Sequence, residues 1–169
     1  QREKALTQIV EAARYVRREP VVLALILLGA LPLLLVIPFV QGLLPVYAPA
    51  VFDVGPAGLG LMMSALGVGA TVGAFIIASL GNVARRGRVL LLGLALAVGA
   101  MAAFSFAPSL SIALLILMIL AGALTSYFTL AGATLQAIVP DSLRGRVAAL
   151  WVMMFGIMPL GSLLAGGLA

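Results

Sequence analysis

Neutral polar side chains on one predicted helix are the residues best suited to chemistry in this sequence. Thr125, Thr129 and Gln136 lie in the apolar stretch 110–138 at spacings of four and seven residues, so a helix would carry them on one face. Hydroxyl and amide groups donate and accept hydrogen bonds, so this face could line a path for a solute. The alternative is helix packing, with each hydroxyl bonded back to its own helix. Gln41, near the end of an earlier apolar stretch, is a further candidate for the path, with the same alternative.

A charged island, V-P-D-S-L-R-G-R-V at 139–147, separates two long apolar stretches. Asp141 or Ser142 is well placed to cap a new helix, because an Asp or Ser oxygen can accept a hydrogen bond from a first-turn amide. Arg144 and Arg146 put two permanent positive charges where the next stretch begins. We expect these arginines to anchor the chain at a membrane surface. A sharper hypothesis is a gate, in which Arg144 pairs with acidic or carbonyl groups of another helix bundle when the inner side is closed.

Other kinds of catalytic chemistry have no residues to support them. The sequence has no cysteine and no histidine, so thiol chemistry and the usual metal ligand and neutral-pH proton carrier are missing. The phosphate-binding pattern G-x-x-x-x-G-K-[ST] is absent too. We therefore expect no enzyme activity, no cofactor and no metal site, and an intramembrane enzyme is the least favoured class. No Asp, Glu, Lys or Arg lies within a predicted span, so any proton-coupling group would lie elsewhere.

The composition excludes an ordinary soluble domain. Of the 169 residues, 64% are hydrophobic and 9% are charged, whereas soluble domains carry about 25% charged residues. This number of charged side chains is too small to cover a surface exposed to water. We therefore expect most of the surface to face lipid, with the bilayer as the main partner. The net charge of +5 would suggest nucleic acid in a soluble protein. Here it belongs to the loops, and orientation in the bilayer explains it better than a nucleic-acid partner.

Apolar stretches of sufficient length predict five membrane spans, because a helix needs about 20 apolar residues to cross the hydrocarbon. The predicted fold is an all-α polytopic membrane helical bundle. We expect Pro32 and Pro38 to kink the first span. Residues 41–56, with further prolines, should form an irregular outer loop, or a frayed helix end and then a loop. The predicted spans cover residues 21–40, 57–80, 89–107, 110–138 and 147–169.

The second span is rich in small residues. Gly69 and Gly73 form a G-x-x-x-G pair, and small residues let helices approach closely in lipid. We expect this span to pack on two sides inside the bundle. A lipid-facing helix with idle glycines is less favoured, since each glycine costs about 1 kcal/mol in a helix interior.

Basic residues fall on one side of the predicted bundle. All ten Lys and Arg lie in segments 1–20, 81–88 and 140–146, and none lies in 41–56 or 108–109. The positive-inside rule therefore places the first three segments on the cytoplasmic side. We expect segment 1–20 to be an amphipathic linker helix at the interface, with Leu6, Ile9, Val10, Ala13 and Val16 on its apolar face. The alternative is a solvated linker that happens to be helical.

Three short motifs carry a resemblance to a known family. They are Y-V-R-R-E-P at 15–20, G-N-V-A-R-R-G-R at 81–88 and the charged island at 139–147. The chain resembles the C-terminal half of a major facilitator superfamily transporter, and most closely the bacterial efflux branch called transmembrane secretion effectors, which includes siderophore exporters. The resemblance implies that the spans correspond to helices seven to eleven of a twelve-helix fold.

The basic loop departs from the superfamily pattern. That pattern has an acidic residue a few positions after its glycine, where this loop has Arg85 and Arg86. The acid–arginine latch attributed to the family therefore does not carry over to this loop. Arg85, Arg86 and Arg88 are instead candidates for contact with anionic lipid headgroups.

The resemblance implies a secondary active transporter that exports a small hydrophobic or amphipathic molecule, drug-like or siderophore-like, by alternating access. The chain starts at Gln1 and ends inside an apolar run, so we expect a fragment of a longer protein in the bacterial cytoplasmic membrane. Its expected partners are the missing N-terminal six-helix half and a small-molecule substrate. The alternative is a non-transporting membrane assembly subunit or a pseudo-transporter fragment.

Overall fold

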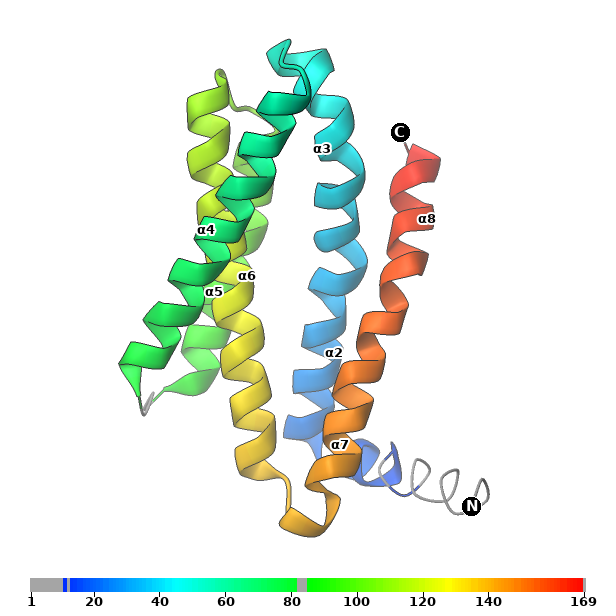
Figure 1. Ribbon diagram of the computed structural model, residues 1–169. Helices are drawn as coiled ribbons and strands as arrows, with labels where there is room; N and C mark the ends of the chain where they lie inside the picture. The colour runs from blue at the N-terminus through cyan, green and yellow to red at the C-terminus, as the bar shows by residue number, and fades with distance from the viewer. Residues whose placement is uncertain (1–10, 12, 82–84, 169) are drawn as a thin grey trace.

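The computed structural model describes residues 11, 13–81 and 85–168, which form helices joined by short turns and contain no strand (Figure 1). The helices are α2 (Pro20–Leu35), α3 (Ile37–Phe52), α4 (Pro56–Leu80), α5 (Arg86–Phe104), α6 (Leu110–Ile138), α7 (Asp141–Met153) and α8 (Met158–Leu168), with a 3-10 turn at Met154–Ile157. Five helical segments in the described part are long and apolar enough to cross a membrane, namely Pro20–Gly42, Pro56–Leu80, Arg86–Phe104, Leu110–Ile138 and Asp141–Leu163. The predicted all-α polytopic bundle is confirmed.

The connections alternate between the two ends of the bundle. The start of α2, the end of α4, the start of α5 and the α6–α7 turn lie at one end, and the α3–α4 and α5–α6 turns lie at the other (Figure 1). The described arginines, which the sequence groups on one side, therefore share one end of the molecule. Most of the linker helix expected over 1–20 lies outside the described residues. Within the described part of that segment, Val16 is buried against the bundle, with 6% of its surface exposed.

Helix α3 excludes a wholly irregular loop over 41–56 and agrees with the alternative, a helix end followed by a loop. The helix continues to Phe52, with Pro45 and Pro49 inside it. Each proline removes one backbone hydrogen bond, but neighbouring helices let a bundle tolerate such losses. The chain leaves the helix at Asp53, whose φ of 51° is left-handed, a conformation that Asp adopts more readily than most residues. The outer loop is thus reduced to residues 53–55.

The first span is interrupted between the two prolines that were expected to kink it. Val36 separates α2 from α3, and it lies between Pro32 and Pro38. The Val36 amide still donates to the Pro32 carbonyl at 3.0 Å, so the chain bends without unwinding. The last span is interrupted as well, by the 3-10 turn at Met154–Ile157, and its helix begins at Asp141 rather than 147.

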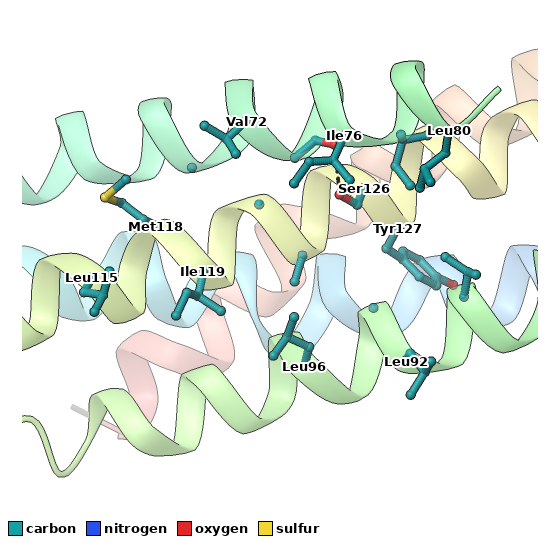
Figure 2. Close-up of a pocket in the computed structure, with 17 residues that line it drawn as sticks. Val72, Ile76, Leu80, Leu92, Leu96, Leu115, Met118, Ile119, Ser126 and Tyr127 are labelled. Atoms are coloured by element: carbon teal, nitrogen blue, oxygen red, sulfur yellow. Dashed lines mark hydrogen bonds between the residues drawn. The ribbon is translucent and has the colours of Figure 1, made fainter. Parts of the chain in front are cut away.

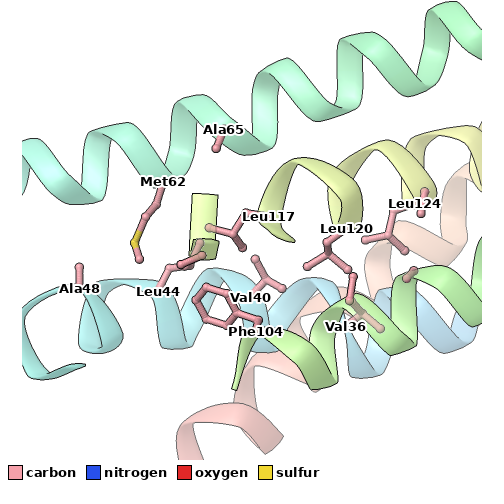
Figure 3. Close-up of a cluster of buried hydrophobic side chains, with 14 residues drawn as sticks. Val36, Val40, Leu44, Ala48, Met62, Ala65, Phe104, Leu117, Leu120 and Leu124 are labelled. Carbon is pink, nitrogen blue, oxygen red and sulfur yellow. The ribbon is translucent and has the colours of Figure 1, made fainter. Parts of the chain in front are cut away.

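The core is built around α6, which packs against α4 on one side and α5 on another. Figure 3 shows the larger apolar cluster, in which Leu117 and Leu120 of α6 meet Met62 of α4, Leu44 of α3 and Phe104 of α5. A second cluster near the basic end joins Val16, Val22, Leu90, Tyr127, Leu135 and Val147, among others. Because α6 contributes to both clusters, it fixes the other helices relative to one another.

Candidate functional site

Close backbone contact holds α4 against α6. A Cβ atom added to Gly69 would overlap the carbonyl oxygen of Met118, and one added to Gly73 would overlap that of Gly122. The Ser126 hydroxyl donates to the Gly73 carbonyl at 3.0 Å across the same interface. Only glycine leaves room for this approach, which sets the position of the α6 face that carries the predicted path residues.

A cavity of about 350 Å³ lies between α3, α4 and α6. Two of the predicted path residues, Gln41 from α3 and Thr125 from α6, line it together. The rest of the wall is apolar or small and consists of Ile37, Val40, Leu66, Gly67, Ala70, Leu120, Ala121, Leu124 and Phe128. The sequence could not show this juxtaposition, because Gln41 and Thr125 belong to helices far apart in the chain.

Thr125 differs from the other threonines whose side chains bond back to their own helix. Thr71 donates to the Gly67 carbonyl at 2.9 Å, and Thr134 donates to the Leu130 carbonyl at 2.7 Å. Within the described residues Thr125 makes no side-chain hydrogen bond of this kind, so its hydroxyl is available to a solute in the cavity. Thr129 and Gln136 are exposed further along α6 and do not line the cavity.

An aromatic cluster that the sequence analysis did not anticipate borders the cavity. Phe128 lines the cavity, and its ring lies 6.3 Å from Trp151 and 6.0 Å from Phe155, measured between centroids. Trp151 is the chain's single tryptophan, and it also packs against Gly29 of α2. These rings bring α6, α7 and the 3-10 turn together beside the cavity, a contact that spacing within one helix cannot reveal.

The arginines of the charged island have partners on this chain. Arg144 pairs with Asp141 at 2.5 Å, three residues earlier on α7. Arg146 pairs with Glu11 at 2.6 Å, which ties the segment before α2 to the start of α7. Glu11 was not among the predicted site residues, because only the folded chain brings it close. At the start of α5, Arg85 and Arg88 are exposed and Arg86 is partly buried.

Comparison with known protein families shows to which family the chain belongs. The sequence profile of the family described as transmembrane secretion effector matches residues 1–169. The chain belongs to this family. No curated protein and no solved structure gives a match to the chain.

As a member of this family with five helices long enough to span a membrane in its described part, the chain is an integral membrane protein of the major facilitator transporter type, as the resemblance indicated. Its family is generally non-enzymatic. Among the described residues, no three His, Cys, Asp or Glu side chains come together to hold a metal. The cavity can offer a solute apolar contact, an aromatic edge and the neutral hydrogen-bonding groups of Gln41 and Thr125.

Proposed function

We propose that the chain forms one helix bundle of a secondary transporter that exports a small hydrophobic or amphipathic molecule by alternating access. The observation that carries the proposal is the cavity between α3, α4 and α6, together with family membership. A second six-helix half would complete the transporter as its partner, in the bacterial cytoplasmic membrane. The direction of transport follows the efflux branch that the sequence resembles.

The cavity wall suits a largely apolar solute with one or two uncharged polar groups. Its volume of about 350 Å³ is at the lower end of the range typical of small-molecule sites. Gln41 can donate and accept hydrogen bonds, and so can Thr125, so together they can orient such a solute without a charge. The Phe128 ring supplies a flat apolar surface beside them. Thr129 and Gln136 extend the path along the same helix toward the basic end.

Alternating access requires parts that move as units. The glycine contact between α4 and α6 makes these two helices one rigid unit, because their backbones touch. Rocking of this unit against a second bundle would expose the cavity to one side of the membrane and then to the other. In this mechanism Arg144 and Arg146, with Arg85 and Arg88, lie at the basic end, where they anchor the bundle and could take part in a gate.

Efflux of an uncharged dye tests the proposal. Cells expressing the intact gene product are loaded with Nile red, and its loss is followed by fluorescence. We expect Thr125→Val and Gln41→Ala each to slow efflux by roughly three- to tenfold, the effect of one lost hydrogen bond. Thr71→Val is the matched control, because the Thr71 hydroxyl bonds its own helix outside the cavity. It should leave efflux unchanged.

Two results would contradict the proposal. If Thr125→Val and Gln41→Ala insert normally and transport at the rate of Thr71→Val, the cavity is not the path. If a correctly inserted wild-type protein moves no dye from a panel of apolar and amphipathic probes, a non-transporting assembly role becomes the better account.

A further inference from the structure

A second hollow in the described structure lies on a different face from the path cavity. It is a groove of about 490 Å³ between α4 and α5, with α6 as its floor (Figure 2). Helices α4 and α5 each pack on α6 more than on each other. Small residues deepen the groove, because its floor at Gly122 and Ala123 and its walls at Gly73 and Gly93 have no bulky side chains. The groove thus follows from the same close packing that fixes α4 on α6.

The groove wall is almost wholly aliphatic. Ile76 and Leu80 of α4 and Leu92 of α5 are exposed on its rims, and Ile119 of α6 lines its floor (Figure 2). Of its two polar side chains, Ser126 is already bonded to Gly73. Such a surface fits a saturated hydrocarbon chain.

The length of the groove matches one leaflet of a bilayer. On α4 it runs from Gly69 to Leu80, which is about 17 Å of helix. Half of a typical hydrocarbon core is about 15 Å. An extended acyl chain of one leaflet therefore matches the groove in length.

Positive charge lies at one end of the groove. Leu80 and Val89 line that end, and they flank the loop 81–88, whose sequence contains three arginines and no acidic residue. Arg85 and Arg88 are exposed at the start of α5; neither lines the groove itself, and Arg88 lines a neighbouring hollow between α2 and α5. Guanidinium groups bind phosphate oxygens through paired, charge-assisted hydrogen bonds. The groove therefore combines an apolar channel of leaflet length with positive charge close to one end.

Tyr127 provides a second, independent observation at the same end. Its side chain is 2% exposed, lines the groove, and its hydroxyl has no hydrogen-bond partner among the described residues (Figure 2). The Tyr127 Cβ atom lies beside Gly93, and Leu90 belongs to the same apolar cluster; these two residues are about 3 to 8 Å deeper along α5 than Arg88. The ester carbonyls of a phospholipid lie just below its phosphate, so one could accept this hydrogen bond once the covering side chains part.

We propose that this groove binds an anionic phospholipid of the adjacent leaflet, with one acyl chain between α4 and α5 and its phosphate on Arg85 and Arg88. The site is separate from the path cavity, which lies between α3, α4 and α6. The proposal does not depend on transport. In this proposal Arg85 and Arg88 bind one phospholipid molecule at a defined site, which differs from a general electrostatic attraction to anionic headgroups.

Native mass spectrometry of the full chain tests the site, with phosphatidylglycerol and phosphatidylcholine offered in equal amounts. We expect retained phosphatidylglycerol to exceed phosphatidylcholine, and Arg85→Gln/Arg88→Gln to reduce that preference by roughly fivefold for each arginine. Arg17→Gln/Arg18→Gln removes the same charge at another exposed position of the basic end and is the matched control. It should keep the preference.

A second pair of variants tests the acyl chain. Val72 lines the groove and is 49% exposed, whereas Val68, one turn away on α4, is 50% exposed and does not line it. Val72→Trp should fill the groove and remove most of the retained phosphatidylglycerol, and Val68→Trp should not. Circular dichroism checks that both variants remain helical.

Three outcomes would overturn the proposal. Equal retention of the two lipids would show that the site does not select an anionic headgroup. Equal phosphatidylglycerol retention by Val72→Trp and Val68→Trp would show that the lipid does not bind in the groove. A dimer present in the wild type and lost only in Val72→Trp would make a second copy of the chain the occupant.

Discussion

The backbone of Gly69 lies directly against the carbonyl oxygen of Met118, so closely that a methyl group at Gly69 would overlap it. Gly73 repeats this contact one turn later, against Gly122. The path cavity and the lipid groove lie near this contact line, and residues of α4 and α6 line both. The line of contact therefore determines the shape of two different surfaces of the protein.

Substitution of this glycine should weaken the bundle. Gly69→Ala forces α4 away from α6, and overpacking of this kind costs about 1–3 kcal/mol. Gly60 lies on the same helix, and a methyl group added there would meet open space, so Gly60→Ala should gain up to about 1 kcal/mol from helix propensity. Thermal unfolding in detergent, followed by circular dichroism, measures both. Equal midpoints for the two variants would show that the contact carries no stability.

The pair Glu11–Arg146 should hold the segment before α2 against the bundle. Both side chains are partly exposed, so the pair contributes only about 0.2–1 kcal/mol to global stability. Its local effect should be clearer. Arg146→Glu should speed trypsin cleavage in the arginine-containing segment 14–18, and the exchanged double variant Glu11→Arg/Arg146→Glu should restore protection. If neither variant changes the cleavage rate, burial of Val16 alone holds the segment before α2 against the bundle.

The Tyr127 hydroxyl should cost stability in the absence of lipid. A buried polar group without a partner is unfavourable by about 1–3 kcal/mol, so Tyr127→Phe should unfold at a higher temperature in lipid-free detergent. Added phosphatidylglycerol should narrow that difference, since the wild-type hydroxyl then gains an acceptor. A lower midpoint for Tyr127→Phe in lipid-free detergent would contradict the expectation.

Membrane orientation can be measured directly because the sequence has no cysteine. Ser109 lies in the α5–α6 turn and Ser142 lies near the start of α7, and both are exposed at opposite ends of the bundle. In intact cells a membrane-impermeant maleimide should label Ser109→Cys, and it should label Ser142→Cys only after permeabilisation. The reverse pattern would place the basic end outside the cytoplasm.

The sequence indicated the helical class and the ends of α6 because those features are local. Pro108 and Pro140 interrupt hydrogen bonding on either side of that helix, and the apolar run between them has no other break. Helix α3 was not predictable in this way. Pro45 and Pro49 predict a break when helix propensity is judged alone, but packing within the bundle outweighs that penalty.

The candidate site was predictable only in part. Thr125 could be nominated from its spacing on one helix, but the presence of Gln41 in the same cavity depends on how α3 meets α6. Glu11 and Trp151 were missed for a similar reason. Their partners lie on other elements, and no pattern within a single segment identifies them.

The two interrupted spans lie beside each other, and this gives the bundle an uneven elasticity. Helix α2 contacts the 3-10 turn at Met154–Ile157, and the break at Val36 separates α2 from α3, which packs along α8. Regular α-helical hydrogen bonding is disturbed at both places, so less work is needed to bend the chain there than elsewhere. Helices α4 and α6 have no such interruption. Under a force applied across the membrane, we therefore expect the side formed by α2, α3 and α8 to bend and the side formed by α4 and α6 to keep its shape.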